Sequence, residues 1–168
     1  MAITNVPFVT GLRVNDTSGD SDLSKKFHNI HDFCIAKNVR KLREGGIGIF
    51  ITSNGTLDNS QNLRNWVVSE GGADFIGAFR LNNKTFGGTS VTSDILVVRK
   101  RINAKKSDNA IDVGTIAGER TAKYDTGDMR TVGGKPKFVV QDLSMDYNRY
   151  FIEHPKRMGG AMFFGFEK

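Results

Sequence analysis

The sequence predicts an α/β fold, in which an open sheet with helices between its strands ends in an antiparallel hairpin. Three observations predict this class. Apolar residues recur at three- or four-residue steps over residues 23–42, short β-branched runs occupy 47–52, 75–80 and 93–98, and glycines separate the helical from the extended segments. A chain of 168 residues, 38% hydrophobic and 25% charged, is long enough to bury one core, which excludes a disordered chain.

The expected elements follow one another in the order β-α-β-α-β-β. A short first strand ends in a loop at Pro7, and the helix over 23–42 stops before Gly45 and Gly46. A second helix covers 60–69. The strands at 75–80 and 93–98 have no helix-length segment between them, so we expect an antiparallel pair, because a parallel crossover needs a longer connection.

The chain divides into three expected regions. Residues 1–102 hold the sheet and its helices. Residues 103–137 contain 10 hydrophobic residues and five glycines, which predicts a long loop or linker. Residues 138–168 form a partial C-terminal extension, in which we expect packing at 138–140 and a helix over 144–153 that Pro155 stops.

The positive charge is concentrated in the C-terminal part. Residues 1–98 have a net charge of +1 and residues 99–168 a net charge of +5, which together give the total of +6. Within the densest stretch, Arg99, Lys100 and Arg101 are candidate contacts for the phosphates of nucleic acid, because such contacts release counterions. The alternative is a solvated strand end without a partner.

Several classes of protein are excluded. The single cysteine, Cys34, cannot form an intrachain disulfide, which fits a reducing cytoplasm. No apolar run approaches the ~20 residues of a membrane-spanning helix, so we expect no membrane partner. His28 and His31 lie three residues apart without a third ligand nearby, and we expect no metal site.

One tetrapeptide suits chemistry on a planar base. Asn5-Val6-Pro7-Phe8 stands at the end of the first strand, where the carboxyl ends of α/β strands form a binding crevice. The Asn5 amide oxygen and the adjacent backbone carbonyl offer two acceptors to one exocyclic amine. Pro7 fixes the turn, and Phe8 offers a ring for stacking. A strand-to-loop turn with an ordinary core phenylalanine is the alternative.

This tetrapeptide resembles the Asn-Pro-Pro-Phe/Tyr motif of S-adenosylmethionine-dependent N6-adenine DNA methyltransferases. Residues 39–57 are similar to the segment that follows the motif in that family, and 80–100 resemble its terminal hairpin. Residues 150–155 and Gly159 resemble a segment beyond the methylase core of methylase–helicase proteins of mobile elements; modification subunits of type I restriction systems are similar too.

The resemblance implies a partial Rossmann-like sheet and a mechanism on extruded adenine. Asn5 and the carbonyl of Val6 would hold the adenine amine, and Phe8 would stack on the ring. Phe86 is a candidate for the second wall of the pocket. The methyl group would come directly from S-adenosylmethionine, the cofactor of the parent protein, and the partner would be double-stranded DNA.

Two departures from the family pattern matter. Val6 replaces the first proline of the motif, although its carbonyl can accept the same hydrogen bond. The glycine-rich cofactor loop of the family lies upstream of the motif, and no such loop precedes Asn5. We therefore expect the C-terminal half of a methyltransferase domain, inactive alone, which pairs with its missing N-terminal half or with itself. The alternative is a catalytically dead DNA-binding or assembly module of a mobile-element or restriction–modification system.

Overall fold

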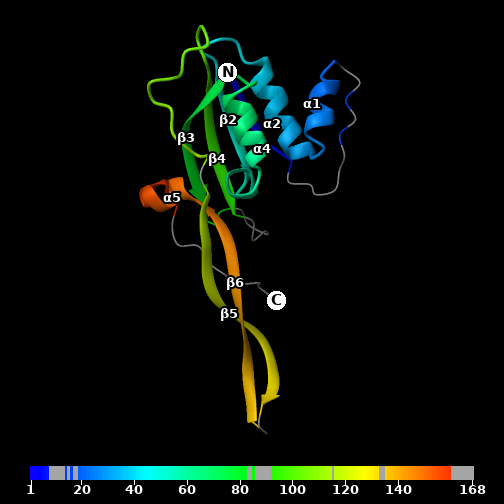
Figure 1. Cartoon of the computed structure of the whole chain (residues 1–168), viewed down its shortest axis with the longest axis vertical. Coiled ribbons are helices and arrows are strands. Elements are labelled where there is room, and N and C mark those ends of the chain that lie inside the picture. Colours follow the sequence, from blue (N-terminus) through cyan, green and yellow to red (C-terminus); the bar gives the residue numbers. More distant parts are fainter. Residues whose placement is uncertain are drawn as a thin grey trace.

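A mixed five-stranded sheet, a layer of helices and a long projecting hairpin make up the computed structural model (Figure 1). The structure describes residues 1–7, 14, 16, 19–82, 85, 92–114, 116–132 and 135–159, and over 116–147 it describes the backbone alone. Phe8, Phe86 and the residues after Gly159 lie outside this range. The chain therefore has an α/β fold, as the sequence predicts.

The sheet has the strand order β1-β2-β4-β3-β7. Its strands are β1 (Ala2–Asn5), β2 (Ile47–Ser53), β3 (Ala73–Leu81), β4 (Ser93–Lys100) and β7 (Met158–Gly159). β1 runs parallel to β2, and β4 lies between β2 and β3 and runs antiparallel to both. β7 pairs with the end of β3 in parallel. β1 is thus an edge strand, and the antiparallel pairing of β3 with β4 is confirmed.

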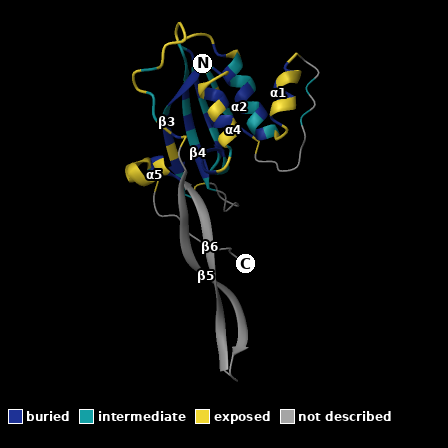
Figure 2. Ribbon diagram, in the orientation of Figure 1, coloured by how far each residue is buried: buried dark blue, intermediate teal, exposed yellow. Residues whose placement is uncertain are grey.

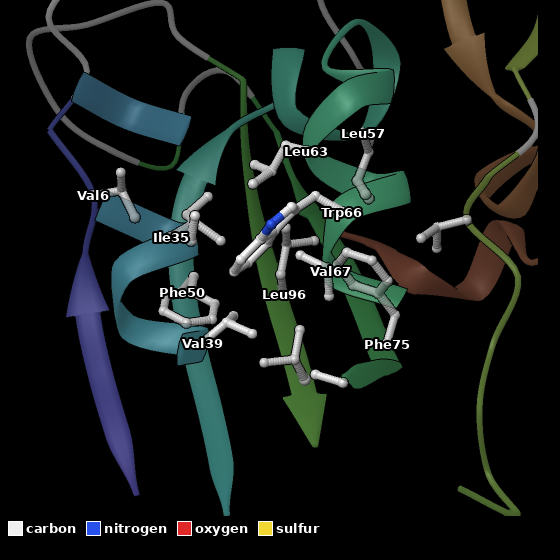
Figure 3. Close-up of a cluster of buried hydrophobic side chains, with 14 of the residues drawn as sticks. Val6, Ile35, Val39, Phe50, Leu57, Leu63, Trp66, Val67, Phe75 and Leu96 are labelled. Carbon is white, nitrogen blue, oxygen red and sulfur yellow. The ribbon is translucent and has the colours of Figure 1, made fainter. Parts of the chain in front are cut away.

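Four helices form a layer on one face of the sheet (Figures 1 and 2). They are α1 (Ser21–Lys26), α2 (Ile30–Lys41), α3 (Gly55–Asp58) and α4 (Gln61–Val68). Phe50 and Leu96, which are opposite each other in the register, are fully buried under Trp66 of α4 (Figure 3). Burial of such side chains contributes roughly 1.5–3 kcal/mol each and holds the helices to the sheet.

The other face of the sheet is apolar and less covered. Burial alternates along β2, with Phe50 buried and Ile49 and Ile51 half-buried on the opposite side. Ile3, in the same row as Ile49, is 63% exposed, and Phe79 is 37% exposed beneath the guanidinium of Arg157. No helix among α1–α4 covers these side chains. Half-buried and exposed apolar side chains therefore lie on this face from β1 to β3.

The helix expected over 23–42 is two helices. The chain leaves the helical conformation at Phe27, whose ring packs edge-on against Trp66 with centroids 5.7 Å apart. Asn29 then caps α2, because its side chain accepts a hydrogen bond from the backbone N–H of His31. The break thus divides the apolar pattern that predicts one helix over 23–42. The helix over 60–69 is confirmed as α4, whereas α3 was not expected.

The loop expected over 103–137 is wrong for most of its length. Strands β5 (Ile116–Val132) and β6 (Lys135–Asn148) pair as an antiparallel hairpin that projects from the body. Few apolar residues suffice there, because the two strands satisfy each other's backbone groups without a second layer. The helix expected over 144–153 is limited to α5 (Arg149–Glu153), which Asn148 caps, with the short 3-10 helix η1 (Pro155–Arg157) after it. No described helix is long and apolar enough to traverse a lipid bilayer.

Candidate functional site

The tetrapeptide motif stands at the end of β1. The backbone N–H of Val6 donates to the carbonyl of Ile51 over 2.9 Å, and the Val6 side chain is 1% exposed in the core. Asn5 and Pro7 are exposed. Within the described part of the chain, no residue hydrogen-bonds to the Asn5 side-chain amide or to the Val6 carbonyl. Val6 thus anchors the end of β1, and among the described residues these two acceptors have no donor.

Three strand ends meet at this edge of the sheet. β1, β2 and β3 end there at Asn5, Ser53 and Leu81, and β4 begins there at Ser93. In open α/β sheets, ligands bind in the crevice outside the carboxyl ends of the strands. Asn5 therefore occupies the edge of the sheet where a ligand is expected.

A buried ion network lies behind this edge. Arg80 of β3 donates from Nε and Nη2 to the two carboxylate oxygens of Asp94 over 2.8 Å, and from Nη2 to Asp58 of α3 over 3.0 Å. All three side chains are at most 3% exposed. Burial raises the pKa of Asp94 to about 6 despite its bonds to Arg80. Burial alone would lower the pKa of Arg80, but its hydrogen bonds to Asp94 hold that pKa above its ordinary value.

Asn148 connects the projecting hairpin to this network. Its backbone N–H donates to Asp58 over 3.0 Å, and its side-chain amide donates to the carbonyls of Leu57 and Val113 over 2.9 Å each. Its side-chain oxygen accepts from the N–H of Tyr150, the first turn of α5. The residue is fully buried. The root of the hairpin is therefore tied to the edge that carries Asn5.

The basic run at 99–101 lies at the other end of the sheet. Arg99 is opposite Ile47 in the register, whereas Asn5 is opposite Ile51, so about 13 Å of strand separates them. Lys100 donates to the carbonyl of Gly71 over 2.7 Å, and Arg101 bonds to Asp74 over 2.6 Å. The structure does not bring these cations together with the motif, and two of them hold the chain's own groups.

His31 and Cys34 are the next residues whose side chains could bind a ligand or react. His31 is buried and contacts the hydroxyl groups of Thr52 and Thr56 through Nε2. In the described residues, no three His, Cys, Asp or Glu side chains gather as metal ligands. Cys34 is half-buried, and this burial raises the pKa of its thiol.

The glycine turn at Gly45 and Gly46 does not have the geometry of a cofactor-binding loop. Gly45, with a positive φ of 70°, lies in a turn that follows α2 and opens β2, so it is neither a helix cap nor a cofactor loop. Its N–H donates to the carbonyl of Lys100, and that of Gly46 donates to Arg43, which leaves neither amide for a ligand.

Comparison of the chain with protein families, with curated proteins and with solved structures finds no match. The α/β fold and its mixed sheet therefore stand on the structure alone.

The sequence reasoning missed the ion network, although a signal for it was present. Arg80 and Asp94 each interrupt a strongly apolar strand, and the two strands were expected to pair. Opposite charges on facing apolar strands indicate a buried ion pair, since a charge is rarely buried without a partner. Asn148 carried no such signal, because its partners come from α3 and from the loop at Val113.

Proposed function

We propose that this chain carries the target-base half of an N6-adenine DNA methyltransferase, and that it binds an adenine extruded from duplex DNA. The observation that carries the proposal is Asn5, an exposed residue that precedes Val6 in the chain and stands at the edge where the carboxyl ends of β1, β2 and β3 meet. The antiparallel strand β4, inserted between β2 and β3, is consistent with the terminal hairpin that the family resemblance implies.

Asn5 and Val6 act on the amine of the base. An exocyclic NH₂ has two N–H donors, and the Asn5 oxygen and the Val6 carbonyl accept one each. Two such bonds orient the amine and draw its protons toward the protein, which leaves electron density on the nitrogen. The hydrogen bond from the N–H of Val6 to Ile51 holds this part of the backbone in place before the base arrives. Little conformational entropy is therefore lost on binding. Methyl transfer requires the cofactor-binding half, and we expect none from this chain alone.

The experiment measures recognition of the amine without methyl transfer. The chain is titrated with a duplex in which adenine lies opposite an abasic site, since such a base is extruded at little cost. A second duplex carries purine, which lacks the amine, at the same position. We expect adenine to bind roughly tenfold tighter, because purine leaves two acceptors without a donor.

Asn5→Ala should remove this preference for adenine. The matched control is Asn65→Ala, the same substitution at an exposed position of α4. Equal affinity for the two duplexes in the unaltered chain, or a preference that survives Asn5→Ala, would exclude the role of the motif.

A second function is favoured by the amides of Gly45 and Gly46, which bond to the chain's own carbonyls and so are not presented to a cofactor. In this reading the chain is a duplex-binding or assembly module without catalysis. It predicts duplex binding with no discrimination between adenine and purine, and the same titration therefore separates the two functions.

A further inference from the structure

The hairpin of β5 and β6 is an arm attached to the ligand-binding edge. β6 has 14 residues, which at about 3.3 Å per residue is about 45 Å of extended strand. Figure 1 shows it leaving the body beyond the ends of β1, β2 and β3. The hydrogen bonds of Asn148 to α3 anchor its root there. The arm therefore reaches outward from the edge that carries Asn5.

Charge is segregated along this arm. Residues 116–148 hold five basic and five acidic residues, so the arm as a whole is neutral. All five acidic residues lie in 116–128 or 141–148, nearer the body. The distal part, residues 129–140, contains Arg130, Lys135 and Lys137 and no acidic residue. The end of the arm thus has a net charge of +3.

The register places these cations on one face of the ribbon. Arg130 is opposite Lys137, and Val132 is opposite Lys135. Because faces alternate along a strand and opposite residues share a face, all three basic positions fall on the same side. Met129, Thr131, Pro136 and Phe138 occupy the other side. Like charges directly opposite each other destabilise a hairpin, and an external anion relieves that repulsion.

We propose that the distal part of the β5–β6 hairpin is a DNA-binding arm, whose basic face contacts the phosphates of a duplex and whose two strands enter its major groove. A two-stranded ribbon fits the major groove of B-DNA, about 12 Å wide. An arm of about 45 Å reaches about 13 base pairs from its root. That this duplex is the DNA that carries the target adenine rests on the proposed function.

The arm also takes the role in phosphate binding that the sequence suggested for the run at 99–101. Those cations lie at the opposite end of the sheet and in part hold the chain's own groups, so they do not supply the phosphate contacts beside Asn5. The distal cations extend from that same edge. Affinity for phosphates then comes from the arm, and the choice of base comes from Asn5, which is the division of labour usual in DNA-binding proteins.

The test uses the full chain and a duplex of about 25 base pairs, long enough for the arm's reach. Fluorescence anisotropy gives the affinity over a series of salt concentrations. The variant Arg130→Ala/Lys135→Ala/Lys137→Ala removes the distal charge. We expect the slope of log affinity against log salt to fall by up to ~2.7, about 0.9 for each lost phosphate contact, and the affinity to fall at least about tenfold at low salt.

The matched control is Lys25→Ala/Lys41→Ala/Arg43→Ala. It removes the same net charge from three exposed positions of the helical layer and its following turn. We expect it to change the slope little. If both variants lose the same slope, the effect is one of net charge and the arm is not a specific contact. An unchanged slope in the arm variant overturns the proposal outright.

An RNA duplex of the same sequence tests groove entry. Its major groove is deep and narrow, so the arm variant should lose less affinity for it than for DNA. Equal losses on both duplexes would overturn insertion into the groove. Failure of the proposed function is distinguishable, because it would abolish the preference for adenine over purine and leave the salt slope of the arm intact.

Discussion

Asn148→Ala tests whether one buried amide joins the hairpin to the body. The substitution removes two donors, from the carbonyls of Leu57 and Val113, and the acceptor that caps α5 at Tyr150. All of these groups lie in the buried interior, where water cannot replace the missing partner at no cost. The backbone bond from residue 148 to Asp58 remains.

The expected loss follows from these three bonds. A buried carbonyl left without a donor costs about 1–3 kcal/mol, and loss of an N-cap side chain costs about 1 kcal/mol. With two such carbonyls and one cap, the sum is about 3–7 kcal/mol of unfolding free energy, or a fall in Tm on the order of 10 °C or more for a chain of this size. Asn148→Ser keeps an acceptor for the cap and should lose about 1 kcal/mol less.

Urea denaturation followed by circular dichroism measures the change. Asn38→Ala is the matched control, because the one described hydrogen bond of its amide goes to the carbonyl of Cys34 within its own helix. Hydrogen exchange should also show faster exchange in β6 and α5 in Asn148→Ala. A loss below about 1 kcal/mol, or one equal to that of Asn38→Ala, would refute the role assigned to Asn148.

Four further results are expected. Two hydrogen bonds from Arg40 lower the pKa of Asp22 to about 2, so an NMR titration should find that midpoint and Arg40→Gln should return it toward about 3.9. The stability from this pair is present above the pKa of the unfolded chain and is lost as the pH falls through about 2. Titration calorimetry of the chain with S-adenosylmethionine should show no micromolar binding; a micromolar Kd would contradict the poor fit of its glycine turn. In a complete methyltransferase domain that contains this segment, Asn5→Ala should abolish methyl transfer and leave duplex affinity nearly unchanged, and a tenth of the original rate would exclude the motif's role. Light scattering at rising concentration should detect association through the edge strand β1 and the apolar face, and Ile3→Lys, at a position 63% exposed, should reduce it; a monomer at every concentration would contradict this expectation.

The sequence was most informative where burial sets the pattern. The strands β2, β3 and β4 and the helix α4 carry clear apolar periodicity, because each has one side or both in the core. Their order along the chain followed from this periodicity, and the antiparallel pairing of β3 with β4 followed from their short connection. The break at Phe27 was harder to place from the sequence, since Phe27 and Ile30 both suit one continuous helix. The contact of Phe27 with Trp66, which accompanies the break, involves a residue far along the chain.

The hairpin and its root could not be found in the same way. β5 and β6 are paired through backbone groups that every residue possesses, so their composition resembles that of a loop. Asn148 became visible only with its partners, which lie as far as 91 residues away. For the candidate site, the sequence places Asn5 at the end of a strand. That Arg99 lies at the opposite end of the sheet follows only from the antiparallel direction of β4.

The link between Asp58 and Asn148 also sets an order of assembly during synthesis. All strands of the sheet except β7, and helices α1 to α4, lie within residues 2–100, so they can fold before the hairpin has been translated. Arg80 and Asp94 are then already paired, but Asp58 waits for a donor that is 90 residues further along the chain. At roughly 5–20 residues per second, the remaining stretch of about 50 residues takes several seconds. During that time Asp58 has Arg80 and Asn54 as its side-chain partners among the described residues, and the hairpin root closes only after these strands have formed, as does the pairing of β7 with β3.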